Sequence, residues 1–252
     1  MEKTESAPES LVETVVQLHW STPVQRPHLA GGMVLLQPGD EVLCLQFGAQ
    51  IAQLGYSQVQ RLVPPGVPVV PVQQPLYKYI SPNAPSLVYQ LGVDQLSIHF
   101  VKPFKDWSEN VKDIQQGADR LLQALQLGGN SASFTSITLR HIYGFADDDT
   151  VILDWLREAF DIHVTFPLSL SSAMEREAKP DFSFNLKTPL AANEPTTLTL
   201  NIRKGELDKL LRIILDSSLT CNSPIEMERV ADSLNSLHAQ WDTIFSGMAS
   251  KI

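Results

Sequence analysis

Cysteine is scarce in this chain, which has two in 252 residues, Cys44 and Cys221. They lie far apart and outside any Cys-x-x-Cys spacing, so the sequence indicates neither a disulfide framework nor a cysteine zinc site. Long apolar runs are missing too, since no stretch reaches the roughly 18 apolar residues of a membrane span. The chain also begins with a polar, acidic stretch where a secretory signal would be basic and then apolar. We therefore expect no membrane span and no export, and we predict a cytoplasmic protein.

Positive charge is in short supply as well. The chain has 19 Lys and Arg against 28 Asp and Glu, a formal net charge of -9, and no basic block offsets this balance. An acidic chain repels phosphate backbones. We therefore predict that nucleic acid is not its partner.

The common signatures of catalysis and cofactor binding are absent. The sequence contains no Gly-x-Ser-x-Gly, no Gly-x-x-x-x-Gly-Lys-Ser/Thr, no Gly-x-Gly-x-x-Gly and no His-Glu-x-x-His. No two histidines stand two or four residues apart, so no single strand or helix face presents paired metal ligands. The sequence thus predicts a protein that is not an enzyme and that holds no cofactor or metal.

What the chain does contain is a mixture of strand and helix patterns, after a polar lead-in over residues 1–10 that we expect to be disordered. Alternation or β-compatible composition predicts strands at 11–20, 33–36, 41–47, 49–63, 87–91, 96–101, 134–145, 182–186, 196–202 and 211–219. The stretch Pro38-Gly39-Asp40 is interpreted as a hairpin turn. Apolar residues at helical spacing predict helices at 104–126, 151–160 and 224–248, with residues 210–215 open to a helical alternative.

These elements predict an α+β fold in which antiparallel sheet meanders are each closed by a long amphipathic helix. We expect residues 11–252 to form a single unit, with two similar halves, 11–130 and 131–252, as an open option. Both long helices should turn their apolar stripes to sheet. Truncating Trp241 to Ala, in the second helix, is therefore expected to cost about 3 to 5 kcal/mol of unfolding free energy.

The segment 64–85 carries seven prolines among apolar residues. Proline cannot donate to a strand ladder, so the sequence argues against a central strand here. One interpretation is an extended loop packed over the sheet; the other is a surface that binds a partner protein. The residues of that surface would be Val69, Val70, Val72, Leu76, Tyr77 and Tyr79.

Arg140 stands in an otherwise apolar predicted strand, where an unpaired guanidinium is costly to bury. It is either salt-bridged or solvent-facing, or it anchors an anion in a sheet-lined pocket. Three histidines on predicted strands, His19, His99 and His141, are the candidates for proton transfer beside it.

Four short stretches carry a resemblance to a known family. They are 91–98 (LGVDQLSI) with 103–107 (PFKDW), 136–143 (SITLRHIY), Leu237-His238 with Phe245, and 10–16 (SLVETVV). In their order along the chain they resemble the motifs of a sporadically distributed bacterial protein family of about this length and of uncharacterised function. Phe104, His141 and Tyr143 depart from the family's pattern. The resemblance implies one full-length α+β unit and, through the sporadic distribution, an accessory protein of the antitoxin, immunity or defence type.

Two functions therefore stay open. The first is a binding protein that acts on a protein partner, as a monomer or as a homo-oligomer. The second is a small-ligand-binding or hydrolase-like protein with an Arg/His pocket between sheet and helix.

Overall fold

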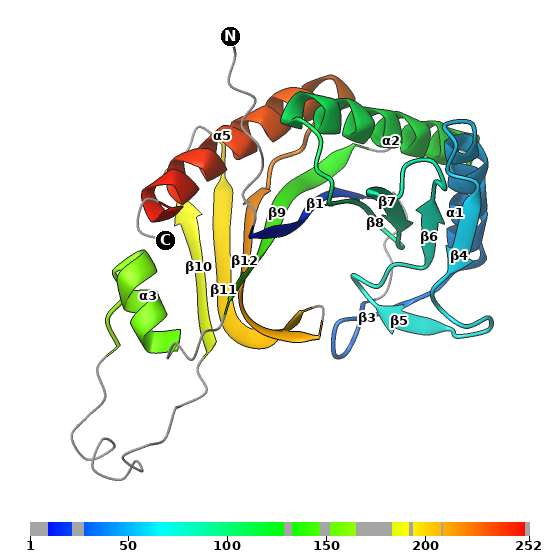
Figure 1. Cartoon of the computed structure of the whole chain (residues 1–252). Coiled ribbons are helices and arrows are strands. Elements are labelled where there is room, and N and C mark those ends of the chain that lie inside the picture. Colours follow the sequence, from blue (N-terminus) through cyan, green and yellow to red (C-terminus); the bar gives the residue numbers. More distant parts are fainter. Residues whose placement is uncertain are drawn as a thin grey trace.

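A curved antiparallel sheet with helices along its outer side forms the body of the protein (Figure 1). The structure is a computed structural model that describes residues 10–21, 28–128, 133–146, 152–164, 183–191, 194–207 and 209–249. The predicted disordered lead-in, apart from Ser10, lies outside the described residues. Among the helices of these ranges, none is long and apolar enough to cross a membrane. The α+β class and the antiparallel pairing predicted from the sequence are confirmed.

The first part of the chain supplies five strands of the large sheet and two helices. In order its elements are β1 (Leu11–Trp20), β2 (His28–Leu29), β3 (Met33–Leu35), α1 (Pro38–Ala52), β4 (Gln58–Arg61), β5 (Val69–Pro71), β6 (Tyr77–Ile80), β7 (Leu87–Leu91), β8 (Gln95–Val101) and α2 (Trp107–Leu127). Strands β2, β3 and β5 form a separate three-stranded sheet.

The rest of the chain supplies the other four strands of the large sheet. Its elements are β9 (Phe134–Ala146), α3 (Ile152–Phe160), β10 (Ser183–Leu190), β11 (Thr196–Leu207), β12 (Leu210–Cys221), the short 3-10 helix η1 (Met227–Arg229) and α5 (Val230–Ala249). The large sheet has nine strands in the order β10-β11-β12-β9-β1-β8-β7-β6-β4. The first strand of the chain thus lies in the interior of the sheet, between β8 and β9.

The face of the sheet toward the helices is apolar. Paired residues of neighbouring antiparallel strands share a face, so the strand register defines rows of side chains across the sheet. One such row runs from β4 to β10 as Val59, Tyr79, Tyr89, Ile98, Val16, Leu139, Leu219, Leu198 and Thr188. Helix α2 packs against β8, and α5 packs against β9 and β12. The predicted orientation of both helices toward sheet is therefore confirmed.

Aromatic side chains fill the space beneath α5. The ring of Trp241, 3% exposed, stacks on His141 at 5.3 Å and donates a hydrogen bond from Nε1 to the hydroxyl of Tyr143 at 3.1 Å. Phe245 stacks on Tyr143 at 4.6 Å. His238, three residues before Trp241 in α5, stacks on Trp107 of α2 at 4.2 Å and so joins the two helices. The expected cost of truncating Trp241 has its physical basis in this cluster.

The predicted strand at 41–47 is wrong, because these residues belong to α1. Of the predicted strand at 49–63, residues 49–52 also belong to α1, whereas 58–61 form β4 and confirm that part of the prediction. Pro38 stands in the first turn, where its missing N–H costs nothing, and the amide of Gln37 donates to Oδ2 of Asp40 at 2.8 Å. What was interpreted as a hairpin turn is thus the start of a helix. The helix has no clear amphipathic stripe, since apolar residues face inward (Cys44, Phe47) and outward (Val42, 50% exposed, and Leu45, 62% exposed).

The proline-rich segment also differs from its prediction. Its residues 77–80 form β6, an internal strand that contains no proline and pairs with both β4 and β7. Prolines are confined to the flanks and to β5 in the small sheet. Of the six residues predicted as a partner surface, Val70, Leu76, Tyr77 and Tyr79 are buried and belong to the core. Val69 and Val72 are half-buried, so this set does not form an exposed partner surface.

Most remaining differences concern boundaries. Helix α2 begins at Trp107 and α5 at Val230, three and six residues later than predicted from 104 and 224. Residues 210–215 belong to strand β12, so the helical alternative is wrong.

The contact of α2 with β7 gives a first prediction. A Cβ at Gly117 in α2 would lie 2.4 Å from Cε1 of the buried Tyr89 ring, whereas a Cβ at Gly39 in α1 would meet nothing within 4 Å. Overpacking of a tight contact costs about 1 to 3 kcal/mol. We expect Gly117→Ala to lower the melting temperature and Gly39→Ala to leave it unchanged or raise it, since alanine is the better helix former by about 1 kcal/mol. Equal melting temperatures for the two variants would contradict this packing.

Candidate functional site

The face of the sheet away from the helices carries polar side chains across its whole width, with a few apolar ones among them. One row crosses all nine strands with hydrogen-bonding side chains at every position but the last. From β4 to β10 it consists of Gln60, Lys78, Gln90, Ser97, Gln17, Thr138, Thr220, Thr197 and Pro189. The next row consists of Gln58, Ile80, Val88, His99, Val15, Arg140, Ser218, Thr199 and Lys187. We call the surface made by these two rows the polar face.

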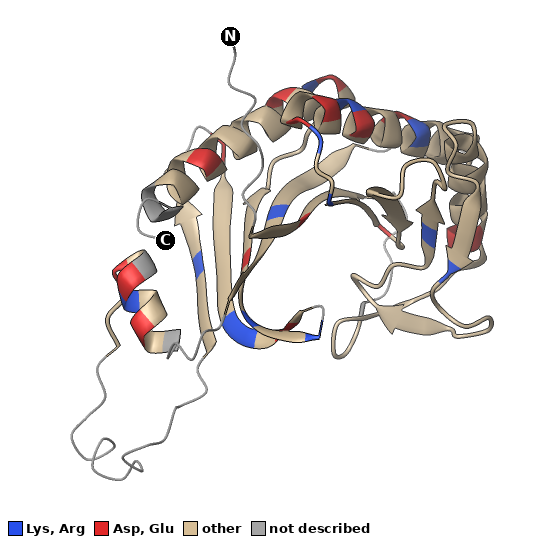
Figure 2. Ribbon diagram, in the orientation of Figure 1, with Lys and Arg blue, Asp and Glu red and all other residues tan. Residues whose placement is uncertain are grey.

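The polar face lies on the hollow side of the curved sheet (Figures 1 and 2). Figure 2 shows that acidic and basic residues mark the outer helices, whereas the strands on the hollow side are mostly without charge. The hydrogen-bonding capacity of this face therefore comes chiefly from hydroxyls and amides.

A pocket of about 580 Å³ lies at the centre of the polar face. Its largest component is a set of six hydroxyl side chains on strands β9, β11 and β12: Thr135, Ser136, Thr138, Thr199, Ser218 and Thr220. The remaining lining residues are Gln17, His19, Trp20, Gln73 and Asp94. Among these described lining residues there is no Lys or Arg. The pocket thus offers many groups that both donate and accept hydrogen bonds, and one carboxylate.

His19 is the titratable base of this pocket. Burial lowers the pKa of His19 below its usual 6.5, while the neighbouring Asp94 carboxylate acts in the opposite direction and only in part offsets the effect of burial. His19 is therefore a neutral hydrogen-bonding group at pH 7. It lies on the half-buried side of β1, as the sequence predicted.

Several buried polar atoms of this region have no hydrogen-bond partner in the part of the chain that the structure describes. They are Nε1 of Trp20, which lines the pocket, Oε1 of Gln95, Nε2 of His99 and Oδ1 of Asn201. Gln95 pairs with His19, and Asn201 with Asp216, so both point to the polar side of the sheet. Buried polar atoms are nearly always satisfied in proteins, by protein groups, by water or by a ligand. Gln95, His99 and Asn201 therefore leave hydrogen-bonding capacity on the polar side of the sheet.

Arg140 is held by an acidic partner. Its Nε and Nη2 donate to the two carboxylate oxygens of Asp216 at 2.7 and 2.6 Å. This hydrogen bonding raises the pKa of Arg140 above its usual value, with the Asp216 and Glu13 charges adding to the effect against burial. The salt-bridged alternative of the sequence prediction therefore describes Arg140.

His99 lies near Arg140 on the polar face, with Val15 of β1 between them in the same row. Its Nδ1 is 2.7 Å from Oε1 of Glu13. The carboxylates of Glu13 and Asp216 thus alternate with Arg140 and His99 along this part of the face. Such an arrangement fixes these side chains in place and neutralises the charge of Arg140.

His141 does not belong to this site. It follows Arg140 directly in β9, and successive residues of a strand point to opposite faces, so His141 lies in the aromatic core beneath α5. Complete burial, with the nearby His238 charge as a smaller cause, lowers the pKa of His141 to about 3. The predicted grouping of Arg140 with three histidines is thus wrong for His141. His99 is close to Arg140, and His19 lies on the same side of the sheet in the central pocket.

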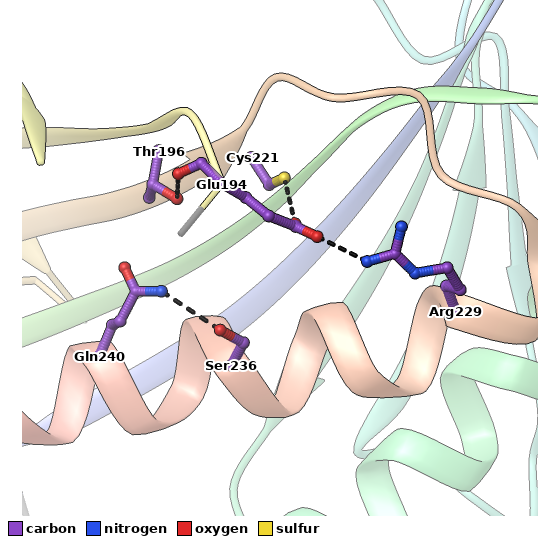
Figure 3. A network of polar contacts seen from close by, with 6 residues as sticks. All are labelled: Glu194, Thr196, Cys221, Arg229, Ser236 and Gln240. Atoms are coloured by element: carbon purple, nitrogen blue, oxygen red, sulfur yellow. Dashed lines mark hydrogen bonds and ion pairs between the residues drawn. The ribbon is translucent and has the colours of Figure 1, made fainter. Parts of the chain in front are cut away.

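A second polar cluster lies on the helix side, where Glu194 connects three segments (Figure 3). Oε1 of Glu194 accepts from Nη2 of Arg229 at 2.7 Å, and Oε2 accepts from Sγ of Cys221 at 3.1 Å. Burial and this hydrogen bond raise the pKa of the Cys221 thiol, so it is not a reactive thiolate. A groove of about 840 Å³ lies beside this cluster along α5. The contacts of Glu194 join the start of β11 to the end of β12 and to η1, which is a structural role.

The sequence holds part of the signal for the polar face. Alternation in β1 assigns Gln17 and His19 to one face, and Thr138 and Arg140 alternate in the same way in β9. The hydroxyls of β11 and β12 and the carboxylate of Asp216 were not predicted as site residues, because only strand pairing brings them beside β9. No protein-family model matches the chain, and no curated protein matches it either.

The burial of His141 gives a second prediction. Because its folded-state pKa is lowered, the unfolded chain takes up a proton below pH 6.5 that the folded protein excludes until about pH 3. This group therefore costs stability as the pH falls through that range, by about 2 kcal/mol between pH 7 and pH 5. We expect the free energy of unfolding of His141→Phe to fall by about 2 kcal/mol less than that of the wild type between pH 7 and pH 5. Denaturant titrations at both pH values measure this difference. His163→Gln, at an exposed position, is the control and should keep the wild-type decline. An equal decline for both variants would contradict the burial of His141.

Proposed function

We propose that the protein is a binding protein whose polar face holds a segment of a protein partner. The observation that carries this proposal is the row of hydrogen-bonding side chains that crosses all nine strands on the side away from the helices. The unsatisfied buried atoms on the same side support it, because a partner's hydrogen bonds would satisfy them.

The dimensions of the polar face favour a macromolecular partner. Nine strands have eight spacings of about 4.8 Å each, so the row is roughly 38 Å long. This length matches about a dozen residues of extended polypeptide. A small molecule would use only the central pocket of the row.

The chemistry of the polar face favours an uncharged polar segment. Of its charged groups, Arg140 is already bound to Asp216, and Glu13 lies against His99. Two lysines, Lys78 and Lys187, stand near opposite edges of the sheet. The centre of the polar face is therefore suited to bind hydroxyl and amide groups, including those of a peptide backbone.

The biological setting of this binding activity follows from the family resemblance. An accessory subunit of the antitoxin, immunity or defence type would bind and neutralise, or assist, a specific protein. The mirrored strand order about β1 and β9 supports the further proposal that the chain has two similar halves, 11–130 and 131–252, each a meander closed by α2 or α5.

A second candidate function, a small-ligand-binding or hydrolase-like protein, has one observation in its favour. The central pocket places His19 near the carboxylate of Asp94 among hydroxyl groups. Its Arg/His version is weakened by the ion pair of Arg140 with Asp216 and by the position of His141 in the core.

Co-purification from the native host tests the proposed function, with two glutamines as a matched pair. Gln17 lies half-buried in the centre of the polar face, and Gln126 is exposed on α2 at the outer side. We expect Gln17→Arg to reduce the recovery of the partner at least tenfold, because a long cation fills the space of the bound segment. Gln126→Arg should recover the partner as the wild type does.

The fold of both variants is checked by thermal melts before the comparison is made. Recovery of the wild-type protein alone, at all salt concentrations, would count against a protein partner. Equal recovery with both folded variants would move the binding surface away from the polar face.

A further inference from the structure

The central pocket of the polar face has the composition of a site for an uncharged, polyhydroxylated ligand. Hydroxyl side chains make up six of its eleven lining residues, and two more, Gln17 and Gln73, are amides. A hydroxyl group donates one hydrogen bond and accepts others, so a cluster of them matches a ligand whose own groups also do both. The pocket volume of about 580 Å³ lies within the usual range for small-molecule sites.

Charge excludes the main alternatives. An anion needs a cation in the pocket, yet the described lining residues include no Lys or Arg, and Arg140 nearby is bound to Asp216. His19 is neutral at pH 7 because burial lowers its pKa. The single carboxylate, Asp94, further disfavours anions and can accept hydrogen bonds from hydroxyl groups.

Trp20 stands at the edge between the pocket and the core. Trp20 is 3% exposed, lines the pocket, and its Nε1 has no acceptor among the described residues. An indole N–H is a donor only, so its acceptor is water, a ligand oxygen or a group outside the described residues.

We propose that this pocket binds a saccharide-like ligand, an uncharged ring that carries several hydroxyl groups. The inference rests on the proposed function, because the pocket is part of the polar face, and it adds the chemical class of a ligand. The same chemistry has two sources, a free saccharide and a sugar carried by the protein partner.

Calorimetric titration of the full chain with glucose, galactose, N-acetylglucosamine and maltose tests the proposal. We expect at least one of these probes to bind with millimolar affinity or better. Glucose 6-phosphate and gluconate carry negative charge on a related framework and should bind at least tenfold more weakly than the best neutral probe. No binding by any neutral probe, or tighter binding of a charged one, would overturn the proposal.

A matched pair of threonine variants and one tryptophan variant locate the site. Thr199→Val in the pocket removes a hydroxyl without changing shape, and Thr188→Val makes the same change on the apolar side of β10. We expect roughly tenfold weaker binding for the first and unchanged binding for the second. Trp20→Phe should weaken binding and remove the ligand-induced change in tryptophan fluorescence, since Trp107, Trp155 and Trp241 lie on the helix side. Equal affinities for both threonine variants would exclude this pocket.

Competition distinguishes the two sources of the ligand. A saccharide that displaces the co-purified partner identifies a sugar carried by that partner, and a saccharide that binds without displacing it identifies a free ligand. Both results support the pocket's chemistry. Partner capture that depends on Gln17, without any saccharide binding, would overturn this inference and leave the proposed function intact.

Discussion

The register of β1 between β8 and β9 is the constraint on which the rest of the structure depends. A strand has two faces, and a shift of one residue would exchange them. In the observed register Val16 and Leu18 join the apolar rows beneath the helices, whereas Gln17 and His19 join the polar face. The core under α2 and α5 and the central pocket are thus two consequences of the same pairing.

A polar face on the side away from the helices is the ordinary condition of an antiparallel sheet that packs helices on one face only. Here the condition is unusual in detail, because several of the polar groups are buried. Ser97 is 4% exposed and Thr138 is 7% exposed, and buried atoms of Gln95 and His99 have no partner in the described part of the chain. A face that only met bulk solvent would leave such groups wet. Their burial in a curved sheet is an observation in favour of the proposal that this face binds a partner.

The strands with clear alternation could be predicted from sequence, as β1, β8 and β9 show. The helix α1 could not, because its outward residues Val42 and Leu45 are as apolar as its core residues and leave no helical stripe to detect. The short internal strand β6 was not predicted, because the alternation of its four residues is a weaker signal than the prolines on both sides of it.

The candidate site could be predicted only residue by residue. Neighbouring residues of a strand point to opposite faces, so the sequence alone already places Arg140 and His141 on different faces of the sheet. The prediction that grouped them in one pocket did not take this alternation into account. The partnership of Arg140 with Asp216 joins positions 76 residues apart, and only the pairing of β9 with β12 makes it visible. Strand order, which a single sequence does not specify, therefore decides which predicted candidates meet.

Site-specific photo-crosslinking in the native host tests the central claim most directly, namely that the polar face is the binding face. A photoreactive amino acid is placed at Lys78 or Lys187, near the two edges of the polar face, and at Gln126 on the outer side of α2. The account predicts cross-links to one and the same protein from both lysine positions and none to it from Gln126. Cross-links to a partner from Gln126 alone would contradict the account.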